Sequence, residues 1–130
     1  MVKVEKVLVN IDLSATAVKS VEWAKELASK FGAELILFYD MDEVNALGDF
    51  ANLFAFPVEP NLKEKTKEKV KKAFQKYLEN FDGNYRYEFI CCGKGKLAEF
   101  IKKENVTIAV LNEKYLSVVP SLECQVLITK

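Results

Sequence analysis

The feature that most constrains this chain is the alternation of short, almost wholly apolar segments with longer amphipathic ones. The segments VEKVLVNI at residues 4–11 and AELILFY at 33–39 are rich in aliphatic residues, which is typical of strands covered on both faces. Between them, apolar residues recur at helical spacing, with Ser14 placed as an N-cap and Gly32 placed to end the helix. The residues predicted to face inward are Ala17, Val18, Val21, Ala24, Ala28 and Phe31.

The same alternation continues to the last residue. A long connection, residues 40–60, leads into a helix predicted from Asn61 to about Asn80. Its inner stripe is predicted to consist of Leu62, Thr66, Val70, Ala73, Tyr77 and Phe81. Further strands are predicted at 85–92, 106–111 and 125–129, and a short helix at 96–104 with Leu97, Phe100 and Ile101 inward and Asn105 in its C-terminal turn.

This order of elements predicts a single α/β domain over residues 1–130, with a five-stranded, parallel, doubly wound sheet in the order 3-2-1-4-5. Because parallel crossovers are right-handed, the first two helices should cover one face and the later connections the other. Residues 112–124, however, are only thirteen and contain no glycine. A parallel crossover needs about a dozen residues, so we expect the fourth helix to be shortened or missing and one face to be under-covered.

Composition excludes several function classes. Lys+Arg and Asp+Glu balance at 19 each, so no overall charge favours nucleic acid or an anionic membrane, and neither is predicted as a partner. Seven lysines lie between Leu62 and Tyr77 in the predicted helix. They are interpreted as a solvated face, because Glu64 and Glu68 each lie one helical turn before a lysine and no arginine lies in this run. No apolar run approaches the length of a membrane span.

Catalytic and metal chemistry find little support. The chain has no histidine, and Cys91, Cys92 and Cys124 show neither a CxxC motif nor zinc-ligand spacing. Adjacent residues of a strand point to opposite faces, so Cys91 and Cys92 are interpreted as core thiols. We predict no catalytic residues, no metal site, a protein that is not an enzyme, and a location in the reducing cytoplasm.

Three stretches, in this order and spacing, resemble the universal stress protein family: KVLVNIDLSATAVKSVEWAKELASKFGAELILFYDMDE, CGKGKLAEFIKKENVTIAVLN and VPSLECQVLITK. Asp12, Glu22-Trp23-Ala24 and Gly93 stand where the family has an Asp after the first strand, a Glu-Trp-Ala pattern in the first helix, and a glycine after the third strand. The resemblance implies a five-stranded α/β fold and a homodimer paired near the fifth strand.

The nucleotide-binding branch of that family carries a glycine-rich motif after the fourth strand, and this chain has NEKYLSVVPSLEC there. Backbone N–H groups wrap a phosphate closely where the chain tolerates unusual φ and ψ angles and lacks a Cβ. We therefore expect no cofactor and no ATP binding of the usual kind. An alternative stays open, in which a reduced pocket for ATP or AMP survives and is lined by Asp12, Leu13, Tyr39, Lys94 and Asn112.

Asp12 itself has two interpretations: a carboxylate that faces an adenine, a ribose or a metal, or a turn residue that helps to cap the first helix.

The connection at 40–60 is apolar for a loop, and large exposed apolar patches often mark interfaces. Three placements stay open: it plugs the ligand cleft, covers the bare sheet face, or meets a partner chain. We predict a homodimer or another protein partner, with the contact formed by Leu47, Phe50, Leu53, Phe54, Phe56, Val126 and Ile128.

Overall fold

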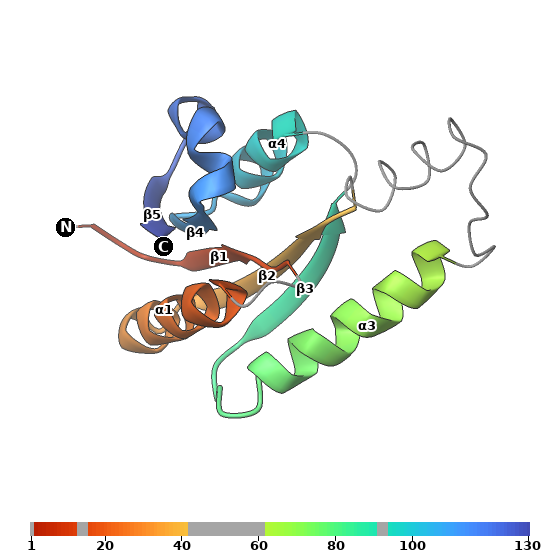
Figure 1. Cartoon of the computed structure of the whole chain (residues 1–130). Helices are drawn as coiled ribbons and strands as arrows, with labels where there is room; N and C mark the ends of the chain where they lie inside the picture. Colours follow the sequence, from red (N-terminus) through yellow and green to blue (C-terminus); the bar gives the residue numbers. More distant parts are fainter. Residues whose placement is uncertain (1, 13–15, 42–61, 91–93) are drawn as a thin grey trace.

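Five parallel strands form one sheet in the order β3-β2-β1-β4-β5 (Figure 1), as the sequence predicted. This computed structural model describes residues 2–12, 16–41, 62–90 and 94–130. The strands are β1 (Lys6–Asn10), β2 (Glu34–Asp40), β3 (Tyr85–Ile90), β4 (Ile108–Asn112) and β5 (Gln125–Thr129). The helices are α1 (Thr16–Phe31), α3 (Leu62–Tyr77), α4 (Lys94–Glu104) and the 3-10 helix η1 (Glu113–Ser121).

Strand β1 lies at the centre of the sheet. Its residue Val9 pairs with Leu37 of β2 on one side and with Val110 of β4 on the other. Val7, Leu8 and Val9 are fully buried. The continuous apolar pattern of this segment therefore has the predicted cause, which is that both faces of the strand are covered.

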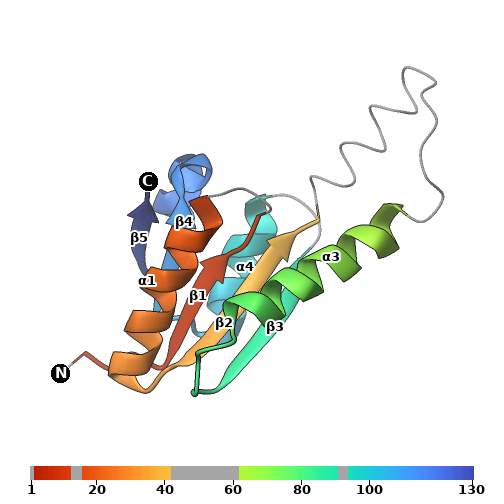
Figure 2. The ribbon, with the colours of Figure 1, turned by 60° about the horizontal axis from the view of Figure 1, so that its bottom comes forward.

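Helices α1 and α3 cover one face of the sheet (Figure 2), as right-handed crossovers require. The buried residues of α1 are Ala17, Ser20, Val21, Ala24 and Ala28. The prediction that Val18 and Phe31 face inward was wrong, because both are exposed. Val18 lies about 100° around the helix from Ala17, and Phe31 is the last residue of the helix.

Helix α3 buries Val70 and Phe74. Phe74 stacks on Tyr87 of β3 with ring centroids 5.1 Å apart, and it also contacts Phe89. The predicted stripe was therefore wrong in giving Ala73 the inner place, since Ala73 is only partly buried and Phe74 is inside.

Helix α4 and η1 cover the opposite face of the sheet (Figure 1). The thirteen-residue connection does not run extended, because nine of its residues form η1. Tyr115 of η1 is only 2% exposed and meets the ring of Phe38 edge-on, with centroids 6.2 Å apart. The expectation of a bare face is thus corrected: a tight 3-10 helix replaces the full α-helix and still supplies a large aromatic side chain to the core.

Two residues with positive φ end helices. Gly32 follows α1 with φ of +63°, and Asn105 follows α4 with φ of 55°, so both C-terminal signals in the sequence are confirmed. The predicted N-cap Ser14 lies outside the described residues. Within the described ranges, none of the helices is long and apolar enough to cross a lipid bilayer.

Candidate functional site

The carboxyl ends of β1 and β4 meet at the point where ligands bind in open α/β sheets. Asp12, just beyond β1, is 9% exposed. Its Oδ2 accepts a hydrogen bond of 2.8 Å from Nδ2 of Asn112, the last residue of β4. The Nζ of Lys114 lies 3.7 Å from the same oxygen. The fold therefore brings Asp12 and Asn112 together, as the predicted pocket required.

Asn112 holds this edge together in three directions. Its backbone N–H donates to Oδ1 of Asn10 at 3.2 Å, and its own Oδ1 accepts from the backbone N–H of Lys114 at 3.2 Å. The second bond makes Asn112 the N-cap of η1. Both polar side-chain atoms of Asn112 and the Oδ2 of Asp12 are thus hydrogen bonded within this edge of the sheet.

The other predicted pocket residues do not join this cluster in the described structure. Tyr39 is buried in the core on the α1 and α3 face, where its ring meets Phe89 edge-on at 6.4 Å. Leu13 and the side chain of Lys94 lie outside the described residues.

Sequence reasoning missed two residues that interact electrostatically with Asp12. One is Lys114, which pairs with its carboxylate. The other is Tyr77: burial raises the pKa of its phenol above the usual 10.0, and the negative charge of Asp12 adds to this rise. Because Tyr77 occupies an inner position of α3, its spacing indicated a core residue and gave no signal of a nearby carboxylate.

Strand β5 forms one edge of the sheet, where the sequence predicted a dimer contact. The backbone N–H of Gln125 donates to Thr107 O at 3.1 Å, so the main-chain groups of Gln125 face toward β4. Because main-chain groups alternate along a strand, those of Val126 and Ile128 face the open edge. The side chains of both residues are partly buried against the core on the α4 side.

An apolar stripe on α1 flanks this edge. Ser20 of α1 is hydrogen bonded to Thr129 of β5, which fixes the side of the helix that faces β5. Trp23, Leu27 and Phe31 fall on that side at spacings of four residues, and Trp23 is 56% exposed. The Glu-Trp-Ala pattern had been noted only as a family resemblance, so the exposed tryptophan beside an open strand is a finding of the structure.

The remaining predicted interface residues, Leu47, Phe50, Leu53, Phe54 and Phe56, lie outside the described residues, and their role stays a prediction. On the other side of the sheet, Leu116 of η1 is also exposed. Leu116 belongs to the connection at residues 112–124, whose conformation the sequence left open.

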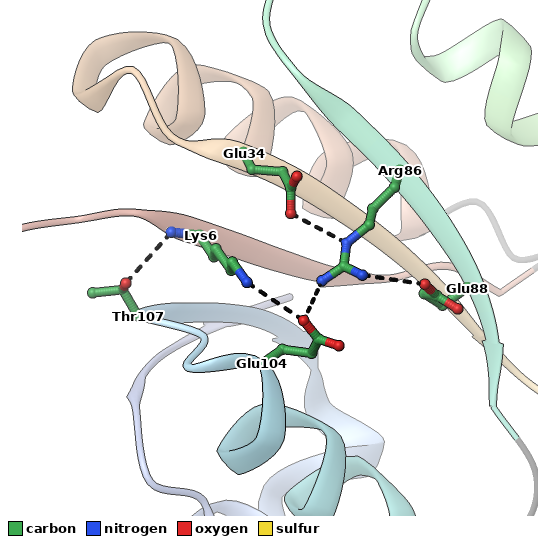
Figure 3. Close-up of polar contacts among 6 residues, drawn as sticks. All are labelled: Lys6, Glu34, Arg86, Glu88, Glu104 and Thr107. Atoms are coloured by element: carbon green, nitrogen blue, oxygen red, sulfur yellow. Dashed lines mark hydrogen bonds and ion pairs between the residues drawn. The ribbon is translucent and has the colours of Figure 1, made fainter.

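A charged cluster ties the amino ends of β1, β2 and β3 to the end of α4 (Figure 3). Arg86 donates to Glu34 at 3.1 Å, to Glu88 at 3.4 Å and to Glu104 at 2.7 Å, and Lys6 bonds Glu104 at 3.4 Å. The hydrogen bond from Arg86 holds the pKa of Glu104 below its usual value of 4.5. All five charged groups have partners within the cluster, so its evident role is to join β3 to α4.

Metal binding finds no support in the described ranges, since they hold no group of three His, Cys, Asp or Glu side chains that could coordinate an ion. Cys124 is partly buried, and burial raises the pKa of its thiol, which lowers its reactivity.

Comparison with solved structures supports the fold. Universal stress protein UspA from Lactobacillus plantarum superposes with a TM-score of 0.73 at 16% identity, covering 100% of both chains. A universal stress protein from Archaeoglobus fulgidus in complex with dAMP gives a TM-score of 0.67 at 14% identity, again covering 100% of both chains.

A third structure, a universal stress protein in complex with cAMP, gives a TM-score of 0.67 at 13% identity, covering 99% of this chain and 98% of that one. Comparison with curated protein sequences gave no match. The sequence model of the universal stress protein family matches residues 3–114. This chain therefore belongs to the universal stress protein family.

Proposed function

We propose that this universal stress protein acts without catalysis, by forming a homodimer through β5, and that it does not bind ATP in the manner of glycine-loop members. One observation carries the proposal: the connection between β4 and β5 is a glycine-free 3-10 helix whose cap, Asn112, is bonded to Asp12. The three cysteines do not have the spacing of metal ligands, which fits a compartment that keeps thiols reduced. We therefore propose that the protein is located in the cytoplasm.

The connection leaves a phosphate little to bind. A phosphate loop offers several backbone N–H groups that converge on one anion, and glycines make that close approach accessible. In η1 the backbone follows a regular 3-10 path, and its Asn112 cap already takes the N–H of Lys114. A triphosphate would have to displace these internal bonds before it could be held.

The β5 edge offers a self-complementary surface instead. If two copies pair antiparallel about Leu127, Val126 of each lies opposite Ile128 of the other, and the outward main-chain groups of both residues bond across the edge. The stripe of Trp23, Leu27 and Phe31 then lies beside the two-fold axis on one face. Tryptophans at the centre of an interface commonly contribute most of the binding energy.

A second candidate function is binding of an adenine nucleotide in a reduced pocket at Asp12. Two proteins with this fold have been solved with dAMP and cAMP, ligands that lack the triphosphate. Such a ligand would need less of the phosphate loop than ATP does, and Asp12 lies at the ligand-binding edge of the sheet.

Thermal unfolding with ATP, ADP, AMP and cAMP separates the two functions, with Mg²⁺ present throughout. The association function predicts a Tm that stays constant as each nucleotide is raised to millimolar concentration. The second function would be established by a Tm that rises with AMP or cAMP in the wild-type protein and does not rise in the Asp12→Asn variant. A rise in Tm with ATP alone would contradict the inference that the glycine-free connection between β4 and β5 does not hold a triphosphate.

Sedimentation of two α1 variants tests the dimer. Trp23→Glu should weaken dimerisation about 30-fold, the size of a strong tryptophan contact. Val18→Glu is the matched control, because Val18 is also an exposed apolar residue of α1 but lies about 140° around the helix from Trp23. A wild-type protein that is monomeric at micromolar concentration, or equal effects of both variants, would refute the β5 dimer.

A further inference from the structure

We propose that β3, at the opposite edge of the sheet from β5, is a second self-association surface, which pairs antiparallel with β3 of another copy about Tyr87. This surface is independent of the β5 contact. Strand β3 is a regular six-residue strand with β2 on one side, and in the described part of the chain no strand pairs with its other side. An open edge of this length presents a row of main-chain donors and acceptors to another strand.

The hydrogen bonds to β2 show which groups are open. The N–H of Leu35 donates to Asn84 O at 2.9 Å, and the N–H of Met41 donates to Ile90 O at 2.8 Å. The main-chain N–H and C=O groups of the even-numbered residues in this segment therefore point toward β2. The main-chain groups of Tyr85, Tyr87 and Phe89 face outward, since these groups alternate along a strand.

These outward groups match in an antiparallel pair centred on Tyr87. Tyr87 then lies opposite Tyr87 of the second copy, and Tyr85 lies opposite Phe89. Each of these is a hydrogen-bonded pair, in which the two residues exchange both N–H···O bonds. Every outward donor and acceptor of the strand from Tyr85 to Phe89 is satisfied in this arrangement.

Side-chain charges select this register. With Tyr87 at the centre, Arg86 lies opposite Glu88 of the other copy, and opposite charges facing each other across strands are stabilising. A shift that centres the pair on Arg86 would place arginine opposite arginine, and one centred on Glu88 would place glutamate opposite glutamate. The first register alone among these three pairs opposite charges, which indicates that a second copy of this chain is the matching partner.

The other face of the strand is aromatic. Tyr85 is 51% exposed and Tyr87 is 37% exposed, although both lie on the face that α3 covers. Aromatic side chains opposite each other across an antiparallel pair stabilise it. Pairing would thus cover two large rings that the monomer leaves in water.

The flanking helices leave room and balanced charge. On the α4 side, a hollow of about 390 Å³ runs along this edge, with Glu88, Ile90 and Phe100 among the residues that line it. On the α3 side, Lys67 lies 5.8 Å from the ring of Phe89 and so marks the flank nearest the edge.

By helical spacing that α3 flank carries Glu64, Lys67, Glu68 and Lys71, two charges of each sign. The stripe Lys65, Lys69, Lys72 and Lys76 falls on the other side of the helix and does not oppose a second copy.

Disulfide trapping tests both the contact and its register. In a parent with Cys91, Cys92 and Cys124 replaced by serine, Tyr87→Cys should form a covalent dimer on mild oxidation, because paired Cα atoms about 5.5 Å apart suit a disulfide. Tyr85→Cys is the matched control, since in this register the two copies of residue 85 lie about 14 Å apart. We expect at least about a tenfold difference in the rate of trapping between them.

Charge reversal provides a second measurement on the native cysteine background. Glu88→Lys turns two opposite-charge pairs into two like-charge pairs and should weaken the β3 association step about tenfold in sedimentation. Glu99→Lys, an exposed reversal on α4 beside the same hollow, should leave it unchanged. Circular dichroism establishes that each variant is folded.

Equal trapping of Tyr85→Cys and Tyr87→Cys, or trapping of neither above the parent, would overturn the proposal. If Tyr87→Cys does not fold, the Glu88→Lys measurement decides. The proposal is overturned if Glu88→Lys associates as strongly as wild type, or if Glu99→Lys weakens association as much as Glu88→Lys does. Neither result depends on β5, because a β5 dimer places the residues at position 87 at opposite ends of a joined sheet.

Discussion

The guanidinium of Arg86 in β3 lies 2.7 Å from the carboxylate of Glu104 at the end of α4, eighteen residues further along the chain. The same guanidinium bonds Glu34 and Glu88 (Figure 3). It also lies 5.9 Å from the ring of Phe100. The sole arginine of the chain thus joins the edge strand, its neighbour in the sheet and the helix that crosses the α4 face.

Replacement of this arginine should destabilise the protein. Arg86→Met would remove the arginine partner of Glu34 and Glu88 and leave Glu104 paired with Lys6. It should cost about 1–2 kcal/mol of unfolding free energy, since the cluster is partly exposed. Arg86→Lys keeps the positive charge but loses the planar guanidinium. Its unfolding free energy should lie between those of wild type and Arg86→Met. Urea denaturation measures the series, and a lysine variant as stable as wild type would show that charge alone matters.

Acid should weaken the same cluster. The pKa of Glu104 is held below its unfolded value, so this residue contributes stability that is fully present above pH 4.5 and is lost as the pH falls through the lower folded pKa. Wild type should therefore lose Tm more steeply than Glu104→Gln below about pH 4.5. Thermal scans across this range measure both slopes, and parallel curves would contradict the assignment.

Two neighbouring residues of η1 should differ sharply when truncated. Tyr115→Ala should cost about 3–4 kcal/mol, because it empties a site packed against Phe38 in the core. Leu116→Ala removes a side chain that is 55% exposed and should change stability by less than about 0.5 kcal/mol. Chemical denaturation gives both values. Similar losses would mean that η1 does not pack on the sheet as described.

Two glycines should respond in opposite directions to alanine. Gly32→Ala forces a Cβ into the left-handed conformation at the end of α1 and should cost roughly 1 kcal/mol. Gly95→Ala lies in α4, where an added Cβ meets nothing within 4 Å, and should stabilise the fold by about 0.5 kcal/mol. The Tm of each variant, compared with that of wild type, checks the sign of each effect.

Local patterns in the sequence were sufficient for the element order and the sheet topology. Continuous apolar runs indicated buried parallel strands, Gly32 ended the first helix, and the handedness of crossovers assigned each helix to a face. They also placed Asp12 and Asn112 at the same edge of the sheet, because carboxyl ends of parallel strands meet there. Each of these inferences needs only neighbouring residues and a rule that all such folds obey.

Helical spacing was less decisive for side chains at the margin of a stripe. Phe74 and Ala73 lie one residue apart, and only the position of β3 put Phe74 inside. Likewise Trp23 and Phe31 are apolar helix residues in the sequence, yet both are exposed beside β5.

By itself the sequence determined the family, the fold class and the absence of glycine from the connection between β4 and β5, because these depend on residue types and on spacing along the chain. The tertiary structure alone decided that the short connection is a 3-10 helix with Tyr115 in the core, and that Arg86 joins three glutamates from three different elements. The physical reason is that packing and ion pairing depend on distances between segments far apart in sequence. Spacing along one segment cannot specify those distances.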